Sequence, residues 1–220
     1  MKKEEKIILS RLVQTTPAFS LNNERIEFIS PDKNICGIYS PSEIEDFEDD
    51  TPINDVGEFL SILDTLGDET IIDSTSKVME LKNGNSSVKY VKSNSDWIKT
   101  IPESFFTRVG EMEVNADFIV TIEDIKKVLK LSGVLGLKDL KISSENSELS
   151  VKALDSNNEE NSVRIDIDSD TNGDFEIYIS IENLAKLGQD TYNVQVLEDV
   201  VKFTSESVSD LTYYVVALNV

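Results

Sequence analysis

The chain has 220 residues and a formal net charge of −21, because 42 Asp and Glu residues outnumber 21 Lys and Arg residues. It contains no His, which excludes imidazole acid–base catalysis and imidazole metal ligands. The single cysteine, Cys36, excludes an internal disulfide and a zinc site built from several cysteines. The start of the chain lacks the apolar run of a signal peptide, and no stretch reaches the roughly 18 apolar residues of a membrane span. We therefore expect a cytosolic protein without a membrane partner.

Hydrophobic periodicity predicts the elements of the first half. A helix is expected from Lys2 to Gln14, and Pro17 closes it. A second helix is expected after an Asn54 or Asp55 cap, and Gly67 is placed to end it. Strands are expected over 25–30, 35–40, 69–73, 77–82 and 88–92, with a hairpin turn at Asn83-Gly84.

The second half repeats this order of elements. A helix is expected from the Thr121 cap to about Ser132, and a short one from the Ser180 cap through Leu187. Strands are expected over 114–120, 140–143, 149–154, 163–167, 175–179, 192–197, 200–204 and 213–218. The halves share a pattern but not letters, and they are similarly acidic. We expect two similar domains, residues 1–99 and 114–220, joined by a connector over 100–113.

Two acidic segments are candidate metal sites. The run from Asp168 to Asp174 has the oxygen spacing and the Gly of the first half of an EF-hand loop, but Ile179 occupies the position of the bidentate Glu. Its flanks alternate like strands, so we expect a hairpin loop without specific calcium or magnesium binding at Asp168, Asp170 or Asn172. In the run Glu43–Asp50, alternation on a strand would make the carboxylates diverge, which favours a solvated edge strand over a magnesium site.

Other features give no catalytic chemistry. Cys36 lies in an apolar run without a basic neighbour and is expected to be a small buried residue. The segment Gly133–Gly136 lacks the Lys of a phosphate-binding loop and is expected to be a helix-to-strand turn. We predict no catalytic residue, no metal site and no cofactor.

Basic side chains gather on the predicted helices. In the helix from Thr121, an apolar arc of Ile122, Ile125, Val128 and Leu129 is separate from an arc, about 100° wide, that carries Lys126, Lys127 and Lys130. The first helix carries Lys3 and Lys6, flanked by Lys2 and Arg11, and the short helix carries Lys186. An ordinary solvated face explains one such helix. Three such helices in a strongly acidic chain with a repeated order of elements weaken that explanation.

The chain resembles the sliding clamps, or DNA polymerase processivity factors, of T-even-type bacteriophages. The most telling segments are Val56-Gly57-Glu58-Phe59-Leu60-Ser61-Ile62-Leu63 and Tyr214-Val215-Val216-Ala217-Leu218, supported by size, acidity and the repeated order of elements. The resemblance implies an α+β DNA-clamp fold with two similar domains per subunit. It implies a homotrimer closed head-to-tail around duplex DNA, with helices lining the hole and antiparallel sheets outside.

The resemblance also implies a function and partners. The protein would be no enzyme but a ring that tethers the phage DNA polymerase, loaded by an ATP-driven clamp loader, in the cytoplasm of the infected bacterial host. Late-transcription factors would be further partners. One departure is that the second helix has no Lys or Arg and carries Glu58 and Asp64 instead.

Three sets of residues are expected to carry this function. The set expected to face DNA is Lys3, Lys6, Arg11, Lys126, Lys127, Lys130 and Lys186. The set expected at the subunit interface, by strand addition, is Val88, Lys89, Tyr90, Lys92, Val163, Arg164, Ile165 and Asp166. The set expected in the pocket for partner peptides is Trp97, Ile98, Ile101, Phe105, Phe106, Tyr213 and Tyr214.

Two other functions remain open from the sequence. One is an acidic structural virion protein with two β-rich domains. The other is a metal-dependent hydrolase that uses the carboxylates of Asp166–Asp174 and Glu43–Asp50. The lysine faces favour the clamp over the virion protein, and the missing His and the diverging carboxylates count against the hydrolase.

Overall fold

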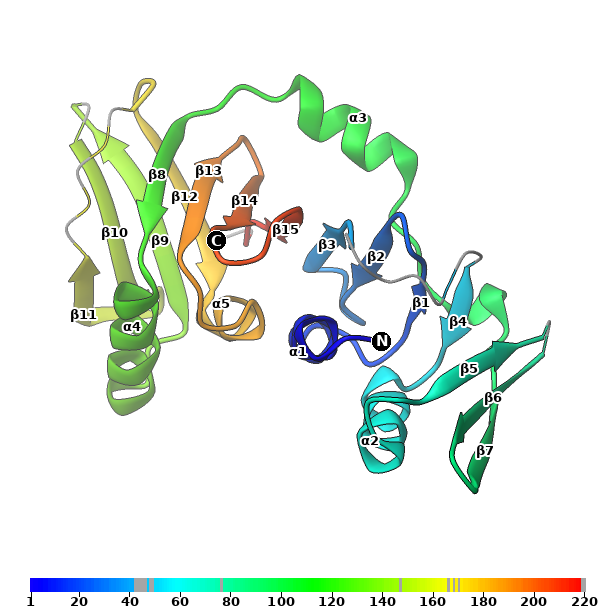
Figure 1. The fold of residues 1–220 in the computed structure, drawn as a ribbon. Helices are drawn as coiled ribbons and strands as arrows, with labels where there is room; N and C mark the ends of the chain where they lie inside the picture. Colours follow the sequence, from blue (N-terminus) through cyan, green and yellow to red (C-terminus); the bar gives the residue numbers. More distant parts are fainter. Residues whose placement is uncertain are drawn as a thin grey trace. The chain divides into compact units, whose positions relative to one another are not determined.

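A computed structural model describes residues 1–41, 47, 50–75, 77–146, 148–165, 167, 169 and 171–218. The chain divides into two compact units (Figure 1). Unit 1 comprises Met1–Pro31 and Gly37–Ile101, and unit 2 comprises Asp32–Cys36 and Pro102–Val220. In the part of the chain that the structure describes, no helix is both long and apolar enough to cross a membrane.

Unit 1 contains two packed helices, α1 (Lys3–Leu12) and α2 (Val56–Leu66), with small antiparallel sheets. One sheet pairs β1 with β4, and another has the order β5-β6-β7. The strands of unit 1 are β1 (Phe19–Leu21), β2 (Ile26–Ile29), β3 (Ile35–Tyr39), β4 (Thr51–Ile53), β5 (Ile71–Ser74), β6 (Val78–Asn83) and β7 (Ser86–Val91); the first two residues of β3 group with unit 2. A 3-10 turn, η1 (Ser95–Trp97), follows β7.

The two helices of unit 1 form where periodicity places them. Leu9 and Leu12 of α1 and Val56 and Phe59 of α2 are fully buried, so each helix turns its apolar stripe to the core. The Asp55 side chain caps α2 by accepting a hydrogen bond from the Glu58 N–H at 2.8 Å. Gly67 ends α2 with a φ of 97°, a conformation that few other residues adopt. Both predicted helices are confirmed.

The α2 cap gives a stability prediction. Asp55→Ala should lower the free energy of unfolding by about 1 kcal/mol, because the Glu58 N–H loses its acceptor. The melting temperature should fall by about 2–4 °C. Asp55→Asn keeps an acceptor oxygen at the cap and should melt close to the unaltered protein. Calorimetry of the two variants checks this, and equal losses for Ala and Asn would show that the cap does not stabilise α2.

The described residues of unit 2 form two antiparallel sheets and three helices. One sheet has the order β11-β10-β9-β12, and β15, β14, β13 and β8 are neighbours in the other. The helices are α3 (Glu103–Glu111), α4 (Ile122–Leu135) and α5 (Ile181–Lys186). The strands are β8 (Ala116–Val120), β9 (Asp139–Glu145), β10 (Glu148–Asp155), β11 (Asn158–Ile165), β12 (Phe175–Ser180), β13 (Tyr192–Val196), β14 (Val200–Ser205) and β15 (Leu211–Val216).

The core of unit 2 lies between its sheets and the helices α4 and α5. Helix α4 packs against β10 and β11, and α5 packs against β12 (Figure 1). Ile125 and Val128 of α4 and Leu184 of α5 are buried. The Thr121 hydroxyl and the Asp124 carboxylate form a capping box at the start of α4, as the sequence predicts.

Four elements were not expected from the sequence. Strands β1 and β4 have three residues each and β4 contains Pro52, so neither gives a periodic signal. The predicted connector 100–113 contains α3, with η1 just before it. Its Ser, Pro and Gly content resembles a linker, but Phe105 and Phe106 give α3 an apolar side that packs on Tyr214. Helix α4 also runs to Leu135, past Gly133, and ends at Gly136 with a φ of 70°.

Candidate nucleic-acid interface

Helix α4 presents the clearest basic face. Lys126, Lys127 and Lys130 are exposed, on the opposite side of the helix from buried Ile125 and Val128. The Lys126 ammonium lies 3.5 Å from the Glu123 carboxylate, one helical turn away. Among the described residues, Lys127 and Lys130 have no carboxylate within ion-pair distance. Two of the three ammonium groups are therefore available to an anionic ligand.

Helix α1 contributes less than its sequence suggests. Lys3 is exposed and Arg11 is half-buried. Lys6 is only 8% exposed, and its Nζ lies 3.1 Å from Asp64 Oδ1 and 3.6 Å from Asp68 Oδ1. Lys6 thus neutralises acidic groups at the end of α2, and this placement argues against a phosphate contact. The acidic residues of α2 were a departure from the family resemblance. The Lys6 ammonium partly compensates their charge.

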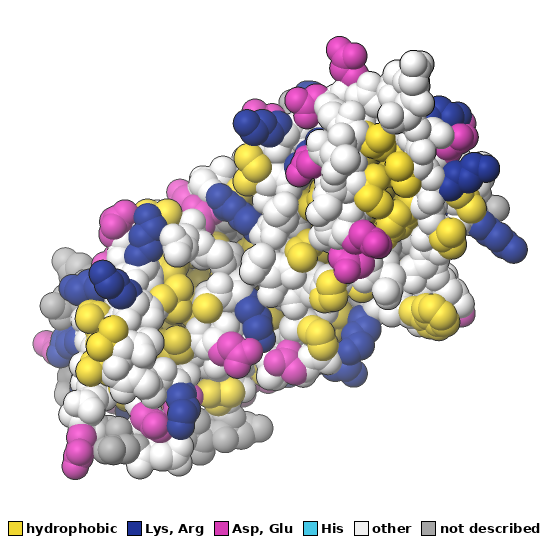
Figure 2. Space-filling model, turned by 90° about the horizontal axis from the view of Figure 1, so that it is seen from below, with side chains coloured by type: hydrophobic (Ala, Val, Ile, Leu, Met, Phe, Trp, Pro, Cys, Tyr) yellow, Lys and Arg dark blue, Asp and Glu magenta, His cyan; other side chains and the backbone are white. Residues whose placement is uncertain are grey.

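Helix α5 is short, and its Lys186 forms an ion pair within the helix. Lys186 Nζ lies 3.0 Å from Glu182 Oε1, four residues earlier on the same helix, and its side chain is 26% exposed. An anionic ligand would compete with Glu182 for this ammonium. Figure 2 shows basic side chains interspersed with acidic and apolar ones on the face seen from below, without a continuous basic patch.

Strand β7 carries three of the expected interface residues, Val88, Lys89 and Tyr90, and Lys92 follows it. It pairs with β6 and is the last strand of its sheet, so its outer edge offers backbone groups for strand addition. Lys89 is exposed, and Val88 and Lys92 are half-buried. The Tyr90 ring instead packs edge-on against Phe59, with centroids 5.4 Å apart, and its hydroxyl donates to the Asp55 carbonyl at 3.3 Å. The Tyr90 side chain therefore packs against the interior of unit 1.

Strand β11 is an edge strand of unit 2. It pairs with β10 and ends its sheet. Val163 and Ile165 are buried in the core, whereas Arg164 is exposed on the opposite face. Asp166, the fourth expected residue, lies outside the described residues. Of the β11 residues expected at the interface, only Arg164 therefore offers an exposed side chain in the described part.

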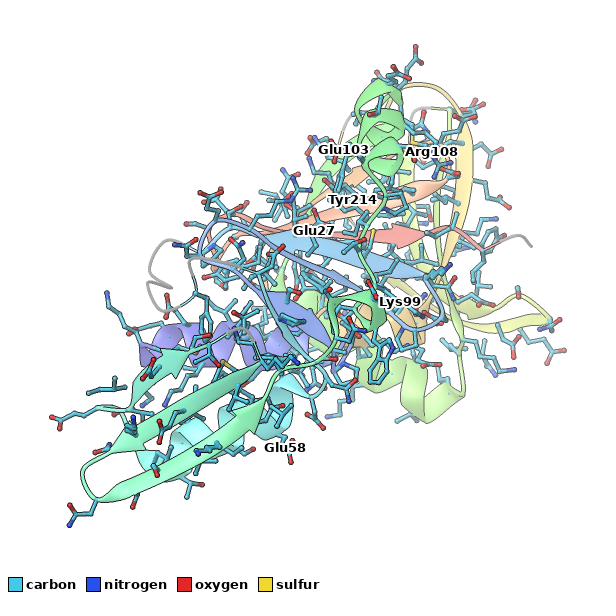
Figure 3. The ribbon with its side chains drawn as sticks, turned by 90° about the vertical axis from the view of Figure 1, so that its right-hand side faces the viewer. Glu27, Glu58, Lys99, Glu103, Arg108 and Tyr214 are labelled. Atoms are coloured by element: carbon cyan, nitrogen blue, oxygen red, sulfur yellow. The ribbon has the colours of Figure 1, made fainter. Side chains whose placement is uncertain are left out.

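The residues expected to form a peptide pocket lie in two units. In unit 1, Trp97 is 75% exposed, while Ile98 and Ile101 are buried. In unit 2, Phe105, Phe106 and Tyr214 form a cluster of edge-to-face rings with centroids 5.4–6.1 Å apart. Figure 3 shows Tyr214 near α3, which carries Glu103 and Arg108. Tyr213 is fully buried and packs edge-on against Tyr192, so it offers no surface to a partner.

A polar cavity lies at the end of α3 and was not predicted from the sequence. It has a volume of about 650 Å³ and is lined by Arg108, Glu111, Met112, Glu113, Asn115, Glu198 and Asp199. Arg108 Nη1 lies 2.8 Å from Asp199 Oδ2. Because α3 was not predicted, no signal in the sequence brought these residues together.

Several acidic residues of the two candidate metal segments lie outside the residues that the structure describes. Asp168 and Asp170, and residues 43–46 and 48–49 of the acidic run, are not among the described residues. The Asn172 side chain donates to the Val114 carbonyl at 2.9 Å, and Asp174 Oδ1 accepts from the Asn146 N–H at 3.0 Å. Cys36 is a buried free thiol, as expected. Within the described ranges, no group of three acidic or thiol side chains is arranged to hold a metal ion.

Comparison with known proteins identifies the fold. No family model matches the chain. A curated relative, the "Sliding clamp" of Vibrio phage KVP40, is 27% identical over 161 residues, which are 69% of this chain and 71% of the relative. The solved DNA polymerase sliding clamp of Caulobacter crescentus superposes with a TM-score of 0.72 at 11% identity, over 98% of this chain. The proliferating cellular nuclear antigen of Entamoeba histolytica superposes with a TM-score of 0.68 at 12% identity.

These similarities confirm the expected resemblance and fold class. The chain is similar in sequence to a phage sliding clamp, and its fold is the α+β DNA sliding-clamp fold. It spans 64% of the Caulobacter chain but 94% of the Entamoeba chain. The two segments that carry the resemblance form the first turns of α2 and the end of β15 with the residues that follow it.

Proposed function

We propose that the chain is the subunit of a DNA sliding clamp, a ring that encircles duplex DNA and tethers the phage DNA polymerase for processive replication. The observation that carries the proposal is the clamp fold, which extends over 98% of the chain and coincides with sequence similarity to a phage sliding clamp. The exposed lysine row of α4 supports it, because a structural virion protein needs no such row.

The ring would be a homotrimer. The chain corresponds to nearly the whole Entamoeba subunit and to about two thirds of the Caulobacter subunit, which fits a subunit of two clamp domains, taken as residues 1–99 and 114–220 with a connector between them. We infer that β7 of one subunit pairs with β11 of the next. Such a contact between unlike edges closes a ring when its rotation is right.

The charge distribution supports sliding rather than fixed binding. Fields decay over about 8 Å at physiological salt, so DNA in the hole would respond mainly to the nearest ammonium groups and less to the acidic exterior. We assign Lys126, Lys127, Lys130 and Lys3 to this face, with Lys186 and Arg11 as weaker contributors and without Lys6. Few phosphate contacts give weak, salt-sensitive binding without sequence preference.

Partners would act on the outside of the ring. A clamp loader driven by ATP would open it, and the polymerase would dock a short peptide at the aromatic region of Trp97 or of Phe105, Phe106 and Tyr214. Late-transcription factors could use the same region. The ring itself would catalyse no reaction and would work in the cytoplasm of the infected host cell.

The function is tested by whether DNA binding requires a free DNA end. Purified protein is threaded onto a fluorescent linear duplex, biotinylated at both ends, in a crowded buffer without a loader. A ring should bind when the ends are open and should fail to bind when streptavidin blocks both ends beforehand. Streptavidin added after binding should trap the protein on the DNA through a high-salt wash.

The same experiment separates a ring from an ordinary DNA-binding surface. A protein that binds along the backbone would associate equally with open and blocked DNA and would be removed by salt. That result would contradict the clamp. Light scattering of the purified protein without DNA should give the mass of three chains.

A further inference from the structure

Three cations form a row on the sheet β11-β10-β9-β12 of unit 2. Lys152 on β10 lies directly opposite Lys141 on β9 and also directly opposite Arg164 on β11. The neighbours of Lys152 along β10, Val151 and Ala153, are buried in the core. By strand alternation, the three cations therefore share the face of the sheet that points away from the core. Lys141, Lys152 and Arg164 together form the cation row.

The strand register places Lys152 between two like charges. Directly opposed side chains on antiparallel strands have Cβ atoms about 5 Å apart, and like charges in such pairs destabilise a sheet. Glu176 compensates the charge of Lys141, since its carboxylate pairs with the Lys141 ammonium, and the Tyr178 ring centroid lies 5.4 Å from the same ammonium. The hydrogen bond to the Glu176 carboxylate also raises the pKa of the Lys141 ammonium. Lys152 has no carboxylate within ion-pair distance among the described residues.

The cation row borders a hollow with hydrogen-bonding side chains. Ser143 and Ser150 are paired across β9 and β10, two residues from the row and on the same face. Together with Lys141, Lys152 and Arg164 they line a surface cavity of about 430 Å³. Ammonium, guanidinium and hydroxyl groups that line one hollow suit a carboxylate. Glu145 and Glu148 close the hollow at the hairpin end.

We propose that the cation row docks a short acidic segment of a partner protein. The flanking Glu145, Glu148 and Glu176, and the net charge of −21, would repel a long polyanion such as nucleic acid. A segment with a few carboxylates spans the row and avoids that repulsion. This site goes beyond the proposed ring function and does not depend on it.

The proposal is tested by Lys152→Glu, with Lys77→Glu as a control that makes the same charge change at an exposed residue of unit 1. The probe is a fluorescein-labelled hexaglutamate peptide, titrated by fluorescence anisotropy at low salt, with hexaglutamine for comparison. Hexaglutamate should bind and hexaglutamine should not. Lys152→Glu should weaken hexaglutamate binding at least tenfold, and Lys77→Glu should change it less than twofold.

The melting temperature gives an independent readout. Lys152→Glu places a carboxylate between Lys141 and Arg164, so it should raise the melting temperature by about 1–3 °C while it weakens hexaglutamate binding. Equal affinities of the two variants for hexaglutamate would overturn the proposal. It would also be overturned if a fluorescent duplex bound better than the peptide and lost affinity in Lys152→Glu, since the face would then be a nucleic-acid surface. Neither measurement needs a ring or encircled DNA, so failure here leaves the clamp proposal standing.

Discussion

Replacement of Lys126, Lys127 and Lys130 by alanine should weaken DNA binding by roughly 10- to 100-fold at physiological salt, because each lost phosphate contact returns condensed counterions to the DNA. The logarithm of the affinity falls by about 0.9 per phosphate contact for each decade of salt. If each of three subunits loses one phosphate contact, the plot of the logarithm of the affinity against the logarithm of the salt concentration should become shallower by roughly 3. Retention on linear DNA with open ends, measured over a series of salt concentrations, gives both quantities.

The structure indicates that this variant will fold. All three lysines are exposed, and such surface substitutions usually change the free energy of unfolding by less than about 0.5 kcal/mol. The capping box at Thr121 and Asp124 is untouched. A matched variant, with Lys138, Lys152 and Lys202 changed to alanine, removes the same charge from strands and loops of the same unit. If both variants lose DNA affinity equally, net charge and not the α4 face controls binding.

The elements of both units were largely predictable because their signals are local. Asp55 before α2, Thr121 with Asp124 before α4, and Ser180 before α5 each mark a helix start within three residues of chain. Strand β13 alternates apolar and polar residues over its full length, and β14 alternates from Val201 to Thr204. In contrast, α3 was hidden because its stability depends on the contact of Phe105 and Phe106 with Tyr214, which lies more than one hundred residues later.

The candidate sites were less predictable, because they depend on distant partners. A helical projection places Lys6 on a basic face, but it cannot show that Asp64, 58 residues later, takes up the charge. The burial of Tyr213 and the inward direction of Tyr90 are likewise set by packing. The cation row required the register of three strands, and no pattern along one strand reveals which cations oppose each other. The α4 face was visible because a single helix carries it.

The proposed ring interface predicts a loss of assembly on charge reversal. Lys89→Glu with Lys92→Glu should raise the dissociation constant of the ring by about 10- to 100-fold, since two attractive charges per contact become repulsive. The partners expected on the neighbouring subunit are Asp166 and Asp168, which follow β11. Light scattering at low micromolar protein should then show monomers where the unaltered protein gives trimers.

Two matched variants make this result specific. Lys77→Glu with Lys82→Glu makes the same charge change in the same unit, but Lys82 lies on the central strand β6, where its ammonium is 2.8 Å from Glu80. This control should stay trimeric. Asp166→Lys with Asp168→Lys, added to the reversed Lys89 and Lys92, should restore the trimer, because the opposite charges are then exchanged across the contact. Assembly that survives the first reversal, or that the exchange does not restore, would place the subunit contact at strand edges other than β7 and β11.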